Sequence, residues 1–143
     1  MADIVMDFLV KAPAERVFQE VSTGHGLGSW WTKRSTGEAK LGAPFELHFG
    51  TGYDWRATVT RCTPHSAFEL QVVAAQEDWL DTRVGFALEA KGQTTTVHFH
   101  HTGWPTANEH WRGSVYCWAM YLRIMRRAIE HGESVPYERR LDV

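Results

Sequence analysis

The sequence predicts an α+β domain in which a curved antiparallel β-sheet wraps around a long C-terminal helix, with two short helices near the N-terminus. Two patterns in the 143 residues carry this prediction. Residues 35–101 form a run of short segments in which apolar and polar residues alternate, as in strands with one buried face. Residues 107–131 carry apolar residues at every third or fourth position, as in an amphipathic helix. Length and composition indicate that residues 1–143 form a single domain.

The N-terminal part is expected to contribute one strand and two short helices. Residues 3–11 alternate between apolar and polar side chains, which predicts a strand with one buried face. Pro13 fits the first position of a helix, and apolar residues follow it at helical spacing. Glycines at positions 24, 26 and 28 interrupt this helix. A short helical turn carrying Trp30 and Trp31 is expected next.

The middle of the chain predicts five strands separated by turns that contain glycine or proline. Short links between successive strands imply antiparallel pairing. Each strand offers one apolar face, so the sheet needs a cover, and a sheet that curls around a helix leaves room between the two. The expected strands cover residues 45–49, 55–60, 68–72, 84–89 and 97–101.

The last third of the chain predicts the covering helix. Thr106 and Glu109 have the spacing of a capping box, with Thr106 at the N-cap. Gly132 suits the C-cap, and the tail at 133–143 is expected to be extended and polar. The apolar stripe of this helix consists of Trp111, Val115, Trp118, Leu122, Met125 and Ile129.

Charge and cysteine content exclude several classes of function. A net charge of −2 gives no electrostatic reason to expect binding to nucleic acid. No stretch is long and apolar enough for a membrane span, and Asp3 and Asp7 break any signal-like apolar run. Cys62 and Cys117 form no disulfide framework and are expected to be reduced thiols, as in a cytoplasmic protein.

Several short motifs, in this order, resemble the START-like superfamily, also called SRPBCC or the birch-pollen-allergen fold, and in particular its AHSA branch. This branch is named for activators of the heat-shock chaperone ATPase. Cys117-Trp118 stands where the family often has Gly-Trp, and the second, N-terminal domain of the eukaryotic activators has no counterpart here. The motifs that carry the resemblance are Val10-Lys11-Ala12-Pro13, Trp30-Trp31, His101-Thr102-Gly103-Trp104 and His131-Gly132-Glu133.

The resemblance implies a helix-grip fold with a cavity between the sheet and the long helix, where a small hydrophobic ligand or lipid binds. The alternative is an aromatic core packed without a cavity. Trp118→Ala is expected to weaken ligand binding more than folding. The candidate ligand-binding residues are Trp31, Trp55, Trp79, Phe86, Phe99, His101, Trp111, Val115, Trp118 and Leu122.

The histidines give a second set of candidates. His98 and His100 share a strand face and could form a metal pair, but this face is the solvent side, and no third ligand is placed to complete a site. His101 shares the buried face, where it either hydrogen-bonds a ligand or pins the corner before the helix. Tyr116 and Tyr121 are further inward candidates. No acid–base pair is evident, so no catalytic residue, metal or cofactor is assigned.

The sequence is compatible with three functions. The leading hypothesis is a noncatalytic binder of a small apolar molecule, monomeric or weakly dimeric. The first alternative is a cofactor of a heat-shock chaperone in the stress response, acting through its outer surface. The second is an enzyme of the cyclase or dehydratase kind that uses His101. An arginine cluster that includes Arg123 and Arg140 is either a docking patch or a solvated helix face.

Overall fold

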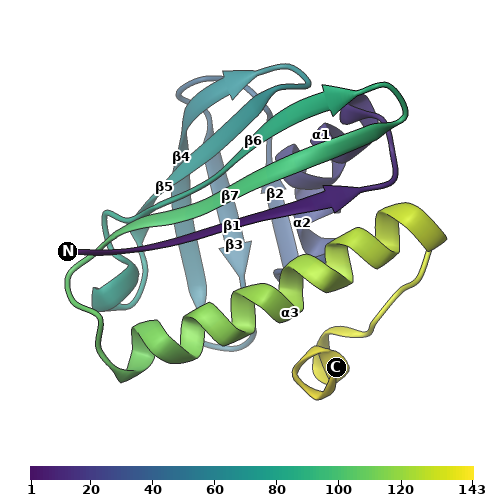
Figure 1. Ribbon diagram of the computed structural model, residues 1–143. Helices are drawn as coiled ribbons and strands as arrows, with labels where there is room; N and C mark the ends of the chain where they lie inside the picture. Colours follow the sequence, from purple (N-terminus) through teal and green to yellow (C-terminus); the bar gives the residue numbers. More distant parts are fainter.

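A seven-stranded antiparallel sheet curves around one long helix, which confirms the predicted fold class (Figure 1). The computed structural model describes residues 1–143. The strand order in the sheet is β1-β7-β6-β5-β4-β3-β2, so the last strand of the chain, β7, pairs with the first, β1. The strands are β1 (Ala2–Val10), β2 (Arg34–Gly37), β3 (Pro44–His48), β4 (Asp54–Thr63), β5 (Ala67–Ala74), β6 (Arg83–Lys91) and β7 (Thr94–Trp104).

Two short helices, α1 (Ala14–Ser22) and α2 (Gly24–Trp30), follow β1. Pro13 is the N-cap of α1 rather than its first residue. The glycines that were expected to interrupt a helix lie inside α2. A side chain at Gly26 would meet the backbone carbonyl of Glu20, and one at Gly24 would meet that of Ser35. These glycines therefore allow α2 to pack directly on neighbouring backbone.

The strand pattern was read correctly from the sequence except at β2. This strand pairs with β3 through Ser35 and Leu47. It is short and contains no apolar side chain, so its sequence shows no alternation of apolar and polar residues. In the other strands, apolar residues alternate with exposed ones, and the apolar faces point toward the helices. Val97, Phe99 and His101 of β7 are all buried, as expected.

Helix α3 (Glu109–His131) covers the concave face of the sheet and begins at a different cap from the one expected. Asn108 is the N-cap, and its side-chain oxygen accepts a hydrogen bond from the backbone N–H of Trp111 at 2.9 Å. The Thr106 capping box is therefore wrong, because Asn108 serves the first turn more directly. Gly132 ends the helix in the left-handed conformation, which confirms the predicted C-cap. No helix has both the length and the apolar character needed to cross a bilayer.

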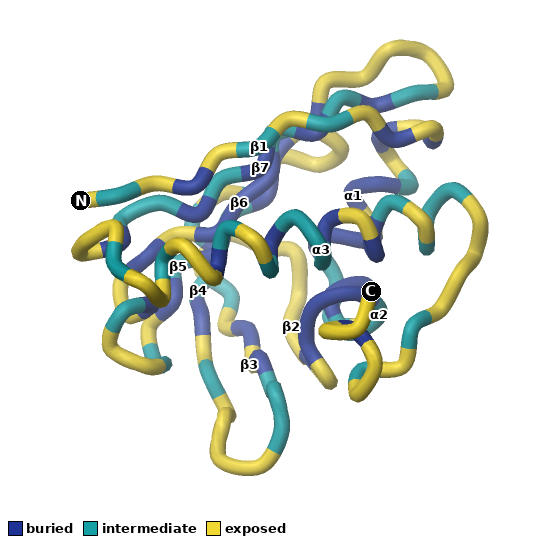
Figure 2. The backbone as a smooth tube through the Cα atoms, turned by 60° about the horizontal axis from the view of Figure 1, so that its bottom comes forward, coloured by how far each residue is buried: buried dark blue, intermediate teal, exposed yellow.

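The C-terminal tail is not extended, in contrast to the sequence-based expectation. Residues Tyr137–Asp142 form the 3₁₀ helix η2, and Figure 2 shows this end of the chain lying over α2. Arg140 is only 5% exposed, and its guanidinium donates to the carbonyls of Thr32, Gly28 and Val135 at 2.9–3.1 Å. Arg140 thus belongs neither to a docking patch nor to a solvated helix face.

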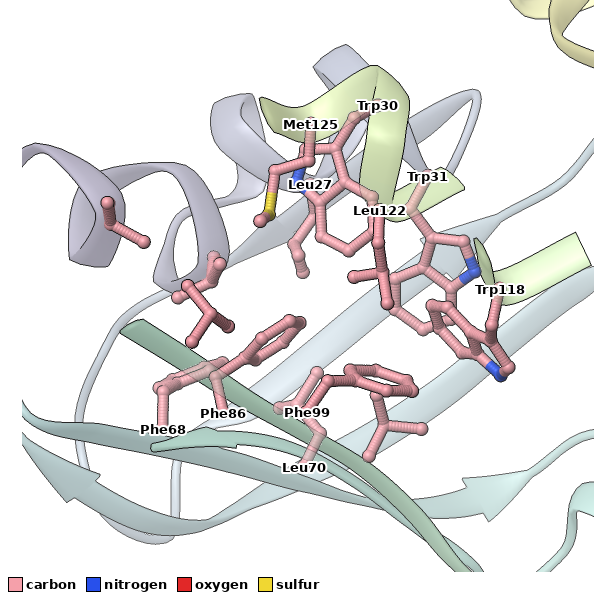
Figure 3. Packing of buried hydrophobic residues seen from close by; sticks show 14 of the residues in the cluster. Leu27, Trp30, Trp31, Phe68, Leu70, Phe86, Phe99, Trp118, Leu122 and Met125 are labelled. Atoms are coloured by element: carbon pink, nitrogen blue, oxygen red, sulfur yellow. The ribbon is translucent and has the colours of Figure 1, made fainter. Parts of the chain in front are cut away.

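The space between the sheet and α3 is filled by interlocking side chains (Figure 3). Trp30 contacts Phe86 edge-on, with the ring centroids 6.0 Å apart, and Trp118 lies 4.7 Å from Phe99 by the same measure. These separations are typical of packed aromatic pairs. Around Trp30, Phe86, Phe99 and Trp118, the interior is therefore a packed aromatic core. This is the alternative to a cavity that the sequence left open.

Candidate functional site

The deepest of the predicted ligand-binding residues are parts of the packed core. Phe86, Phe99, Trp118 and Leu122 are at most 4% exposed and contact other core side chains. Trp111 and Val115 are half-buried against the same cluster. Because Trp118 is a fully enclosed core residue, we now expect Trp118→Ala to damage folding at least as much as binding, contrary to the sequence-based prediction.

His101 is buried, and both of its ring nitrogens take part in a chain of hydrogen bonds within the protein. The indole N–H of Trp118 donates to Nδ1 of His101 at 3.0 Å, and Nε2 of His101 lies 2.9 Å from the hydroxyl of Thr82. Thr82 in turn donates to the carbonyl of Trp79 at 2.6 Å. This arrangement fixes the tautomer, with Nδ1 accepting and Nε2 donating.

Burial keeps the His101 ring neutral. Desolvation lowers the pKa of His101 to about 3, and the neighbouring His100 and His110 add to this effect. Because both ring nitrogens are engaged within the protein, neither is free for an acid–base role at a ligand. His101 therefore acts as the structural histidine that pins the corner before α3.

An open cleft lies at one end of the core, where three tryptophans from separate parts of the chain pack together. Trp31 follows α2, Trp79 lies in the short helix η1 (Glu77–Trp79), and Trp118 lies in α3. The three rings contact one another in a triangle, with centroid distances of 6.2 Å between Trp31 and Trp79, 5.9 Å between Trp79 and Trp118, and 5.1 Å between Trp31 and Trp118. We call these three residues the tryptophan stack.

The cleft has a volume of about 300 Å³ and is lined mainly by aromatic residues. We call it the aromatic cleft. A smaller space of about 30 Å³ also adjoins the tryptophan stack and reaches Ser114 and Cys117 of α3. The aromatic cleft is lined by Trp31, Phe49, Tyr53, Trp55, Gln76, Trp79, His110 and Tyr121.

The cleft brings together only part of the predicted site. Trp31, Trp55 and Trp79 line it, as the sequence indicated, and Tyr121 does so as an inward candidate. Tyr116 instead is 79% exposed. Sequence reasoning did not assign Phe49, Tyr53, Gln76 or His110 to a site. The helical spacing could have identified the α3 residues of the site, because positions 110, 114, 117, 118 and 121 lie on one face of the helix.

Polar groups in and around the aromatic cleft are few. The indole N–H of Trp79 is buried and has no hydrogen-bond partner. Burial raises the pKa of the Tyr121 phenol, which stays protonated at neutral pH. At the rim, Nδ1 of His110 lies 2.9 Å from a carboxylate oxygen of Asp78. A largely apolar wall with a few polar groups is typical of sites for small molecules.

Other concavities lie on the outside of the molecule. A groove of about 550 Å³ runs between the edge strand β1 and α3, and Leu122 lines it together with Met6, Phe8 and Arg123. A polar hollow of about 660 Å³ lies at the β3–β4 turn and is lined by Lys33, Arg34, His48, Asp54 and residues 50–52, with no apolar side chain. Neither encloses the predicted aromatic set.

His98 and His100 lie on the outer face of the sheet, as expected, and pair with carboxylates. His98 contacts Asp7 at 2.8 Å and Glu89 at 3.3 Å. His100 reaches across the sheet to Glu69 at 2.7 Å. Gly85 makes this possible, because a side chain there would collide with the His100 ring. No group of three or more histidine, cysteine or acidic residues is arranged to hold a metal ion.

Known proteins resemble this chain in both sequence and fold. The family model described as activator of Hsp90 ATPase homolog 1-like protein matches residues 11–130. The Aha1 dimer of Colwellia psychrerythraea is 27% identical, with a TM-score of 0.83 over 94% of this chain and 100% of that one. A comparison with curated proteins found no match.

Two further solved structures share the fold at lower identity. A protein of Staphylococcus saprophyticus is 18% identical, with a TM-score of 0.78 over 94% of this chain and 96% of its own. CalU16 of Micromonospora echinospora is 20% identical, with a TM-score of 0.72 over 98% of this chain and 81% of its own. Figure 1 shows the features that these similarities concern, a curved sheet with one long helix across it.

Proposed function

The chain belongs to the family of activator of Hsp90 ATPase homolog 1-like proteins, and from this premise we propose that it binds a small, flat, apolar molecule in the aromatic cleft. The ligand lies against Trp31, Trp55 and Trp79, at the mouth of the groove between the sheet and α3. The site is thus shallower than the enclosed cavity that the sequence suggested, because the deep interior is filled by core side chains.

The single observation that carries this proposal is the unpaired N–H of Trp79. Trp79 is 8% exposed, and its indole nitrogen has no partner although the ring lines an open cleft. A buried donor without an acceptor costs about 1–3 kcal/mol. Because the nitrogen itself is not solvent-accessible, a ligand with an acceptor atom, such as an ether or carbonyl oxygen, removes this cost when the Trp79 ring turns its N–H toward the cleft. The N–H groups of Trp104 and Trp111 are also unpaired, but those rings do not line the cleft.

The other predicted residues support the ligand indirectly. Trp118 backs the tryptophan stack and is held by His101. Phe86 and Phe99 fill the core behind it. Ligand affinity comes mainly from desolvating apolar area on the exposed side of the stack, at roughly 25 cal/mol per Å² before the cost of ordering the ligand.

The proposal is tested with 2-methoxynaphthalene, a flat apolar molecule with one ether acceptor. Titration is followed by tryptophan fluorescence in the wild-type protein and in Trp55→Ala. We expect the variant to bind at least several-fold more weakly, because Trp55 forms one wall of the cleft. Tyr116→Ala, on the exposed side of α3, is the matched control and leaves affinity unchanged. Equal affinity in Trp55→Ala and the wild type would overturn the proposed site.

A chaperone cofactor acting through its outer surface is the second candidate. The observation that favours it is the 27% identity to an Aha1 dimer. Binding to a purified heat-shock chaperone ATPase, measured by calorimetry, tests it. Gln76→Trp at the rim fills the aromatic cleft, so chaperone binding that survives this change separates the two functions. Light scattering then decides between a monomer and a weak homodimer.

Location and physiological role stay predictions. The free thiols of Cys62 and Cys117 are consistent with a cytoplasmic protein. Cell fractionation tests this location. Roles in lipid binding and in the stress response follow only from the resemblance. Mass spectrometry of the protein as purified, under non-denaturing conditions, tests the first of them through the added mass of a retained lipid.

A further inference from the structure

The rim of the aromatic cleft carries a histidine that is held in place from two sides. His110 is in the first turn of α3, and its Nδ1 lies 2.9 Å from the carboxylate of Asp78 in η1. Its ring and that of Trp104 pack in a T-shaped pair, with the centroids 5.2 Å apart. The side-chain amide of Asn108 also reaches Asp78, at 3.4 Å. The position of His110 is thus fixed before any ligand arrives.

The pairing with Asp78 also decides which ring nitrogen of His110 carries the proton. The hydrogen bond from His110 lowers the pKa of Asp78, so the carboxylate is ionised and acts only as an acceptor. Nδ1 must therefore carry the hydrogen. In the neutral ring, Nε2 is then an acceptor, and it has no hydrogen-bond partner in the protein. His110 lines the aromatic cleft.

We infer that the Asp78–His110 pair makes the aromatic cleft selective for ligands with a phenolic or enolic hydroxyl group, which donates its hydrogen to Nε2 of His110. This inference rests on the proposed function and names its ligand class. The flat body of the ligand lies on the exposed side of the tryptophan stack, and the hydroxyl lies at the end of the cleft that His110 borders. The negative charge of Asp78 beside the ring disfavours a ligand carboxylate at this position.

The distance along α3 fits a molecule of a few fused rings. His110 and Tyr121 border the same cleft and are eleven residues apart, which corresponds to about 16 Å of helix. A bicyclic phenol reaches His110 while its second ring still covers part of Trp79. The half-buried phenol of Tyr121 and the N–H of Trp79 then remain for acceptor atoms elsewhere on a larger ligand.

The test compares 2-naphthol with 2-methoxynaphthalene, which has the same rings but no hydroxyl hydrogen. In the wild-type protein at neutral pH we expect 2-naphthol to bind about fivefold more tightly, the effect of one net hydrogen bond at a rim position where the His110 side chain is 41% exposed. In His110→Phe, which keeps a ring against Trp104 but removes the acceptor, we expect this ratio to fall to about one. Affinity for 2-methoxynaphthalene should change little.

Two further variants sharpen the result. Asp78→Asn keeps His110 but no longer forces the hydrogen onto Nδ1, so the ratio should fall to an intermediate value. His98→Phe, on the outer face of the sheet, is the histidine control and should leave the ratio unchanged. Equal affinity of the wild type for both probes, or a ratio that survives His110→Phe, would overturn the inference. Failure of both probes to bind at all would instead refute the proposed function.

Discussion

The two ends of the groove between the sheet and α3 both contain aromatic side chains but differ in whether the indole N–H groups have hydrogen-bond partners. At the closed end, the indole N–H of Trp30 donates to the carbonyl of Glu20. At the open end, the N–H of Trp79 has no partner. Rings alone therefore do not distinguish a core from a binding site. The distinction lies in which unpaired donor belongs to a ring that borders open space, and among the unpaired indoles of Trp79, Trp104 and Trp111 only Trp79 lines the cleft.

The two ends of the groove also differ in which helices and turns cover them. Helices α1 and α2 pack on the sheet beside α3 at the closed end (Figure 1). The open end is bordered instead by short elements: the single turn of η1, the β3–β4 turn, and η2, whose Tyr137 hydroxyl donates to the carbonyl of Phe49. A short element brings too few side chains to fill the groove. We therefore expect substitutions at the closed end to act on stability and those at the open end to act on binding.

The largest expected effect is a loss of stability on truncation of Trp118, the member of the tryptophan stack that packs against the core. Trp118→Ala removes a 1% exposed indole and leaves Nδ1 of His101 without a donor. We expect the free energy of unfolding to fall by about 4 kcal/mol, the range found for large-to-small changes in cores. Urea denaturation measures this loss. A fall of less than about 1 kcal/mol would show that this end is not tightly packed.

The second effect is a dependence of stability on pH that arises from His101. The unfolded chain binds a proton at this residue near pH 6.5, whereas the folded protein binds it only near pH 3. The stabilising contribution is therefore complete above about pH 6.5 and is lost as the pH falls toward about 3. Between about pH 6.5 and 4 the expected loss is about 3 kcal/mol.

The control for this pH dependence is His101→Gln. Its amide can accept from Trp118 and donate to Thr82 but does not titrate in this range. Denaturant midpoints collected across this pH range should give a shallower slope for the variant than for the wild type. Identical slopes would mean that His101 is not buried in the neutral form.

A smaller effect is expected where the tail contacts α2. Arg140→Ala leaves the carbonyls of Gly28 and Thr32 without their donor, and we expect a loss of about 2 kcal/mol in the free energy of unfolding. Arg139→Ala, an exposed neighbour in the same 3₁₀ helix, is the control and should change stability by less than about 0.5 kcal/mol. Thermal unfolding of both variants distinguishes an anchored tail from a loose one.

The smallest effect on stability is expected at the open end. Tyr53 is 47% exposed and borders the aromatic cleft. Tyr53→Ala should change the free energy of unfolding by less than about 0.5 kcal/mol, yet it should weaken binding of 2-methoxynaphthalene several-fold because it removes part of the cleft wall. If stability and binding fell together, the two ends would not be separable.

Sequence patterns predicted the fold well because they report burial. Period-two alternation located six of the seven strands, and the helical stripe from Trp111 to Ile129 located α3. The same patterns missed β2, whose polar residues form a short strand, and placed the cap of α3 at Thr106 instead of Asn108. Arg140 was taken as a surface residue, because nothing in its local sequence indicates the carbonyl groups that bury it.

The site was harder to predict for a physical reason. Core and cleft positions share the same apolar periodicity, so Phe99 and Trp31 look alike in the sequence although only Trp31 borders open space. The state of His101 depends on Thr82 and Trp118, which are distant in the chain. His110 becomes notable only when Asp78 is brought beside it.

The most direct test follows the indole N–H signals of the seven tryptophans by ¹H–¹⁵N NMR during titration with 2-methoxynaphthalene. The N–H of Trp79 should shift most, since it gains an acceptor, and that of Trp31 or Trp55 should shift through ring currents. The N–H of Trp30, which is bonded to Glu20 in the closed core, should stay in place. A shift at Trp30 with none at Trp79 would contradict binding in the aromatic cleft and place the ligand inside the core.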